Sequence, residues 1–130
     1  MTERTLNEES YPLSGLTEKI IGCAIRVHKT LGPGFVEKIY QGALEKEFTK
    51  YKLQFAREKK INVRYDNEII GYQVIDFVVE NKVVVELKAV SELGSIHAGQ
   101  LVSYLKATNI EIGLVLNFAK GKLNIKRVKL

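Results

Sequence analysis

The spacing of apolar residues changes from a helical to a strand-like period near residue 52. No other feature of the sequence restricts the possible folds as much. Before this change, apolar residues between Leu16 and Leu31 recur every three or four positions, as they do on one face of a helix. The stretch "LGPG" (31–34) ends this helix because proline cannot continue a helical hydrogen-bond ladder. A second helix is predicted at 36–49.

After residue 52 the apolar period shifts towards two, which predicts strands. The strand-like runs lie at 53–58, 60–65, 69–79 and 82–89, with turn residues between them. A third helix is predicted at 96–107, followed by short strands at 111–117 and 122–128. The predicted order is therefore α-α-β-β-β-α-β-β. Helices before and after a meander indicate a mixed β-sheet flanked by helices, an α/β or α+β fold.

Length and composition predict one domain without covalent cross-links. The 130 residues, 45% of them hydrophobic, suit a single domain at 14–130 preceded by a flexible N-terminal arm at 1–13. The single Cys23 excludes an internal disulfide. No apolar run approaches the roughly 18 residues that span a membrane, and the polar start is unlike a signal peptide. We therefore expect a cytoplasmic protein with no membrane partner, and the net charge of +5 weakly favours a polyanion.

Charged residues interrupt a hairpin that is otherwise apolar, "IDFVVENKVVVELKA" (75–89). Side chains alternate between the two faces of a strand, so Glu86 and Lys88 share one face. If the chain turns through residues 80–82, Asp76 lies directly opposite Glu86, whereas a two-residue turn would separate them. The same alternation predicts the two faces of the strand before residues 80–82. Val74, Asp76 and Val78 should lie on one face, and Ile75, Phe77 and Val79 on the other.

Two opposed carboxylates repel each other and are costly to bury, unless a cation lies between them. Oxygen ligands suit Mg²⁺ or Mn²⁺ better than zinc, and such an ion can turn a bound water into a nucleophile. Lys88, on the same face, would position that water or hold a phosphate. The alternative is a solvated strand face on which Glu86 pairs with Lys88.

Polar residues also occur on helix faces that should pack against the sheet. Glu37 falls in the middle of the arc formed by the apolar residues of the second helix and Gln41. In the third helix His97, Gln100 and Tyr104 follow steps of three and four and form a polar stripe. Two ordinary explanations remain open: an acid in the first helical turn favours the helix dipole, and Gln and Tyr often lie at a core margin.

Three stretches together resemble a known family. They are "VHKTLGPGFVEKIY" (27–40), with G-x-x-E-x-x-Y as Gly34, Glu37 and Tyr40, then "IDF" with "VVVELKAV", and "HAGQLVSYL" (97–105). The combination is similar to the small bacterial and archaeal GxxExxY proteins, which are assigned to the PD-(D/E)XK nuclease superfamily. The likeness covers about residues 14–128 and implies a restriction-endonuclease-like core. "QLVSY" is similar to the Q-x-x-x-Y motif of RecB-like nucleases, which lies beside the active site.

The resemblance implies a metal-dependent nuclease with Mg²⁺ (or Mn²⁺) as cofactor. The expected metal ligands are Asp76, Glu86, the carbonyl of Leu87 and the helix-borne acid Glu37. We expect Asp76, Glu86, Lys88 and Glu37 to be the catalytic residues, with Lys88 assisting the water. The expected substrate-binding and supporting residues are Gln100, Tyr104, His97 as a phosphate contact, and Tyr40.

The expected substrate is DNA, in repair, recombination or defence, with RNA as an open alternative. One variant of this function is a structure-specific endonuclease like the Holliday junction resolvases, and the small size of the domain allows a homodimer. A second class is a nucleic-acid-binding module that keeps the fold without catalysis. A third is a structural or partner-binding protein whose charged residues are solvated.

Overall fold

The computed structural model describes residues 13–130, so residues 1–12, most of the predicted arm, lie outside the described residues. The structure confirms the predicted order of elements. In chain order they are α2 (Ser14–Leu31), α3 (Glu37–Lys50), β1 (Phe55–Tyr65), β2 (Glu68–Val79), β3 (Val83–Lys88), α4 (Ser95–Thr108), β4 (Ile112–Asn117) and β5 (Asn124–Lys129).

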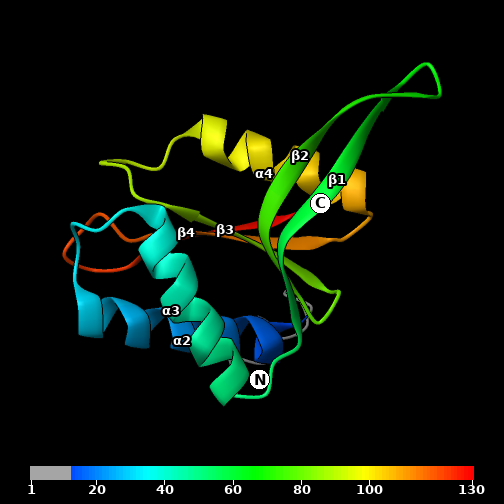
Figure 1. Cartoon of the computed structure of the whole chain (residues 1–130). Coiled ribbons are helices and arrows are strands. Elements are labelled where there is room, and N and C mark those ends of the chain that lie inside the picture. The colour runs from blue at the N-terminus through cyan, green and yellow to red at the C-terminus, as the bar shows by residue number, and fades with distance from the viewer. Residues whose placement is uncertain (1–12) are drawn as a thin grey trace, which may run out of the picture.

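The molecule has three layers, with a sheet between helices (Figure 1). Helices α2 and α3 cover one face of the sheet, and α4 covers the other. The strand order is β1-β2-β3-β4-β5, in which β3 and β4 are parallel and all other neighbours are antiparallel. The predicted mixed sheet flanked by helices is therefore confirmed.

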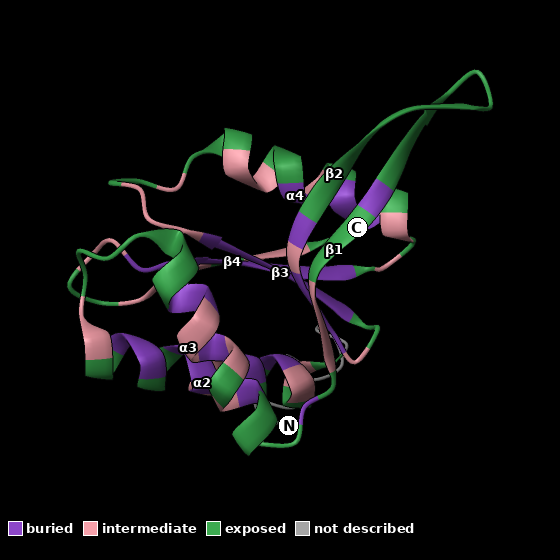
Figure 2. Cartoon of the chain, viewed as in Figure 1, coloured by how far each residue is buried: buried purple, intermediate pink, exposed green. Residues whose placement is uncertain are grey.

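Each face of the sheet has its own apolar core, and the central strands are buried between the two (Figure 2). Odd-numbered residues of β3 pack against α2 and α3, whereas Val84 packs against α4. Helix α4 lies unusually close to β4, because a Cβ atom on Gly113 would come within 2.8 Å of the Leu101 side chain. The absence of a side chain at Gly113 thus sets the distance between α4 and the sheet.

The two predicted runs at 53–58 and 60–65 form one continuous strand, β1, with a sharp distortion at Glu58. Glu58 has a left-handed backbone (φ 54°), which is rare within a strand. The prediction that Ile75 shares a face with Phe77 was wrong: Ile75 packs in the α4 core with Val78, whereas Phe77 packs in the opposite core. The ribbon of β1 and β2 therefore changes faces at Glu58 and at Asp76, which the register places opposite it.

Beyond this change of faces, β1 and β2 leave the sheet and extend past α4 as a two-stranded ribbon (Figure 1). We call residues 59–74 the β-arm. It crosses α4 where Ile61 is buried and where the Tyr104 hydroxyl bonds to the Gln73 side chain at 3.3 Å. Within residues 13–130, no helix combines the length and the apolar character needed to cross a membrane.

Candidate active site

The turn between β2 and β3 has the length that the carboxylate pair requires. Val79 pairs with Val83 and Phe77 pairs with Val85, so three residues, 80–82, form the turn, and the alternative of a two-residue turn is excluded. Glu80 and Asn81 both have positive φ angles, which turn the chain tightly. Continued by one residue, this register brings Asp76 opposite Glu86.

At the carboxylate pair, backbone N–H groups donate to side-chain oxygens of the opposite strand instead of to backbone carbonyls. The backbone N–H of Asp76 donates to Oε2 of Glu86 at 2.8 Å, and the N–H of Leu87 donates to Oδ2 of Asp76 at 2.8 Å. Each carboxylate is thereby fixed by one oxygen. The other oxygen of each, Oδ1 of Asp76 and Oε1 of Glu86, accepts no hydrogen bond from any residue between 13 and 130.

Burial makes ionisation of this pair unfavourable. Glu86 is only 5% exposed, and burial, followed by the charge of Asp76, raises its pKa to about 8. Burial likewise raises the pKa of Asp76, and the charge of Glu37 adds to the effect. Without a cation, burial therefore favours the protonated form of Glu86.

Helix α4 brings two further polar residues to the pair. The Lys88 ammonium, at the end of β3, donates to Oε1 of Gln100 at 3.0 Å. Tyr104 lies one turn farther along α4, and burial, followed by the charges of Glu86 and Asp76, raises the pKa of its hydroxyl. Gln100 and Tyr104, two of the three residues of the predicted polar stripe, thus lie near the charged residues of the hairpin.

Glu37 lies on the predicted arc of α3, whose other members are buried, but its own side chain does not pack against the sheet. It is the first residue of α3 and is exposed, in the first turn where an acid is favoured by the helix dipole. Its charge nevertheless raises the pKa of both Asp76 and Glu86, so it lies near them. No three acidic, histidine or cysteine side chains of residues 13–130 are grouped closely enough to hold a metal ion by themselves.

Comparison with known proteins identifies the family. The sequence model of the PD-(D/E)XK nuclease superfamily matches residues 14–128. The chain belongs to this superfamily. Its members are phosphodiester hydrolases that typically use divalent metals. No relative was found among curated proteins.

A solved structure supports the same fold. The crystal structure of SSO0001 is similar with a TM-score of 0.58 and 16% sequence identity. The similarity covers 98% of this chain but only 61% of SSO0001. It therefore shows a shared fold over part of the longer protein and does not extend to that protein's function.

The donor set fits the kind of ion that the superfamily uses. Mg²⁺ is commonly bound in proteins by one or two carboxylates, with water and substrate phosphate as the other ligands. Oδ1 of Asp76 and Oε1 of Glu86 are two such oxygens without a hydrogen bond to residues 13–130. A cation between them would also offset both causes of the raised pKa of Glu86, which are burial first and the charge of Asp76 second.

The structure places the two other predicted residues in local structural contacts. The Tyr40 hydroxyl donates to the carbonyl of Gly32 at 2.6 Å and accepts the N–H of Phe35 at 3.2 Å, which closes the loop before α3. His97 accepts the N–H of Gly94 through Nδ1 at 2.9 Å, which caps α4. A contact of either residue with substrate stays a prediction.

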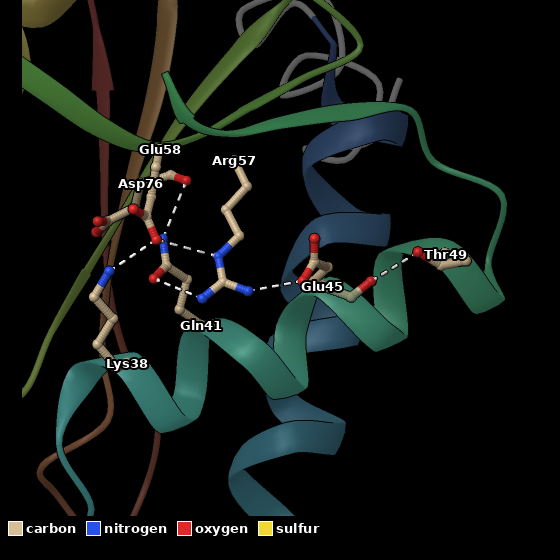
Figure 3. Close-up of polar contacts among 7 residues, drawn as sticks. All are labelled: Lys38, Gln41, Glu45, Thr49, Arg57, Glu58 and Asp76. Atoms are coloured by element: carbon tan, nitrogen blue, oxygen red, sulfur yellow. Dashed lines mark hydrogen bonds and ion pairs between the residues drawn. The ribbon is translucent and has the colours of Figure 1, made fainter. Parts of the chain in front are cut away.

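Sequence reasoning did not assign a role to two residues that hold the strand of Asp76 (Figure 3). The Gln41 amide on α3 donates to the backbone carbonyl of Asp76 at 3.4 Å. Its oxygen accepts from Arg57 at 3.3 Å, and Arg57 also pairs with Glu45 at 2.7 Å. The only sequence signal was a glutamine on the apolar arc of α3, where it is indeed buried.

Proposed function

We propose that this protein is a metal-dependent nuclease that hydrolyses phosphodiester bonds in DNA, in repair, recombination or defence. The observation that supports this best is the pair formed by buried Glu86 and half-buried Asp76 beside Lys88. A buried acid with a strongly raised pKa is costly for a fold and is typical of functional sites. Within the superfamily, we place the chain among the GxxExxY proteins, because Gly34, Glu37 and Tyr40 match that motif.

The proposed reaction uses the carboxylates to bind Mg²⁺ or Mn²⁺. Asp76, Glu86 and the carbonyl of Leu87 would hold the ion, and Glu37 would contribute from the exposed end of α3. When bound, such an ion polarises the phosphate and lowers the pKa of an attacking water. The backbone N–H bonds to Asp76 and Glu86 keep both carboxylates in place before substrate arrives.

Lys88 stabilises the negative charge that grows on the phosphate during hydrolysis. Its ammonium is directed by Gln100, so Gln100 is a positioning residue in this reaction. Tyr104 supports the site through its bond to Gln73, next to the carboxylates. His97 contacts a flanking phosphate from the first turn of α4, where the helix dipole favours anions.

The test is cleavage of a labelled panel of single-stranded, duplex, flap and four-way-junction DNA, with an RNA counterpart. Wild type is compared with Lys88→Ala in Mg²⁺, Mn²⁺ or EDTA at low salt. Lys82→Ala is the matched control, because Lys82 is exposed in the turn that precedes the same strand. We expect cleavage that needs metal, is lost in Lys88→Ala and is retained in Lys82→Ala.

Other outcomes would replace the proposal. Preferential cutting of the four-way junction would identify a resolvase-like enzyme, and cutting of RNA would change the substrate. Salt-dependent DNA binding without cleavage would favour a binding module of the same fold. A protein that neither cuts nor binds would contradict a nucleic-acid function altogether.

A further inference from the structure

Large apolar side chains are exposed along the β-arm. Four of them, Tyr65, Ile69, Ile70 and Tyr72, are more than half exposed, and Val63 and Val74 are 38% and 43% exposed. The part of the arm beyond α4 is exposed on both strands (Figure 2). Concentrated exposed apolar surface of this kind marks an interaction site in most proteins.

The outer face of the arm points away from the rest of the molecule. Gln73 faces α4, because it bonds to Tyr104. Its neighbours Tyr72 and Val74 therefore project from the opposite face, beside their cross-strand partners Asn62 and Lys60. Lys60 lies over the Tyr72 ring at 4.2 Å, so even this face presents a cation next to an aromatic surface.

Charge is divided along the length of the arm. Lys59 and Lys60 lie at its base, whereas Asp66 and Glu68 lie at its tip together with one cation, Arg64. None of these five side chains forms an ion pair with any residue between 13 and 130. The base of the arm is therefore positive and its tip has a net negative charge, with exposed apolar side chains between them.

We propose that the β-arm binds a second copy of this chain, with the two arms antiparallel about a two-fold axis. In that arrangement the acidic tip of each arm lies against the basic base of the other, and the apolar side chains pack between them. A two-fold contact requires such a self-complementary patch. Acids at the tip would repel the phosphates of a nucleic acid, which makes DNA a poorer occupant of this surface.

The contact involves the faces of the arms. β1 is an edge strand, but Lys59, Lys60 and Arg64 are the kind of edge residues that prevent one sheet from continuing into another. At roughly 3.3 Å per residue, the seven residues of each strand give the arm a length of about 23 Å. A surface of this size predicts a dimer that dissociates on dilution.

The first test is sedimentation velocity of the full chain over a wide range of concentrations, without nucleic acid. Ile70→Asp and Tyr72→Asp place a charge on the arm, and both side chains are exposed, so the fold should tolerate them. Ile96→Asp, at an equally exposed apolar residue on α4, is the matched control. We expect wild type and Ile96→Asp to dimerise and both arm variants to stay monomeric.

A charge exchange tests the antiparallel arrangement. Lys59→Glu with Lys60→Glu should weaken the dimer, as should Asp66→Lys with Glu68→Lys, because each creates repulsion between base and tip. All four substitutions together should restore it, since every contact again joins opposite charges.

Three results would overturn the inference. They are a wild type that is monomeric at every concentration, a dimer that the arm variants leave intact, and a fourfold variant that does not recover. If wild type is itself monomeric and the arm variants lose DNA affinity, the arm belongs to the nucleic-acid interface instead. Because the readout of the first three results is mass, none of those three depends on whether the protein is a nuclease.

Discussion

The proton on Glu86 determines how the metal-free protein responds to pH. Its pKa is raised from 4.5 to about 8, first by burial and then by the charge of Asp76. The folded state therefore holds this proton more tightly than the unfolded chain does. The resulting contribution to stability is fully present below about pH 4.5 and is lost as pH rises through about 8.

We accordingly predict that the free energy of unfolding in EDTA falls by a few kcal/mol between pH 5 and 8.5, at about 1.4 kcal/mol per unit of pKa shift. Urea titrations at a series of pH values measure this. In Glu86→Gln, which cannot ionise, the decline should become shallower. An equal slope in both proteins would show that Glu86 is not the residue responsible.

Gln100 should affect catalysis without affecting stability. Its side chain is exposed and its contact is the Lys88 ammonium, so Gln100→Ala leaves the fold within about 0.5 kcal/mol of wild type. A less well directed Lys88 should slow cleavage roughly tenfold, equivalent to about 1.4 kcal/mol in the barrier. Single-turnover rates measure this effect. Ser103→Ala, an exposed residue one turn away, should cut at the wild-type rate.

At the scale of the elements, Gly113 determines how closely α4 lies over the site. In Gly113→Ala the new Cβ would meet buried Leu101 at 2.8 Å, so α4 must shift or the core must strain. We predict a loss of about 1–3 kcal/mol in chemical denaturation. Because α4 carries Gln100, cleavage should also slow. Gly99→Ala is the control, because a Cβ there meets nothing within 4 Å. It should neither destabilise the protein nor slow cleavage, and so tests whether an added methyl group on α4 is by itself enough to cause these effects.

Periodicity predicted most of the elements because each one shows its buried face in its own sequence. The helices were found for that reason, whereas the length of the turn after Val79 was left open, and with it the opposition of Asp76 and Glu86 that the register now places there. The change of faces at Glu58 was not found, because glutamate rarely adopts a left-handed backbone and no apolar pattern signals it. The contacts of Gln41 and Arg57 join elements far apart in sequence, which local patterns do not encode.

At the scale of the whole molecule, a metal that binds only the folded state should stabilise all of it. Mg²⁺ at about a hundred times its dissociation constant adds about 2.7 kcal/mol. Thermal denaturation with Mg²⁺ and with EDTA should therefore show a higher Tm with metal for wild type. Asp76→Ala should show no difference, whereas Glu111→Ala, which removes an exposed acid outside the site, should respond as wild type does. An unchanged wild-type Tm would contradict the metal site.

The three-residue turn at 80–82 also limits how this protein can change during evolution. The chemistry of Asn81 and Lys82 is free to vary as long as the backbone can turn, whereas Glu80 also accepts the N–H of Gln54 through its side chain at 2.6 Å. Its length is not free. Insertion or deletion of one residue would slide β2 along β3 and transfer every side chain of one strand to the other face. A single codon gained or lost there would separate the two carboxylates while leaving both of them in the gene.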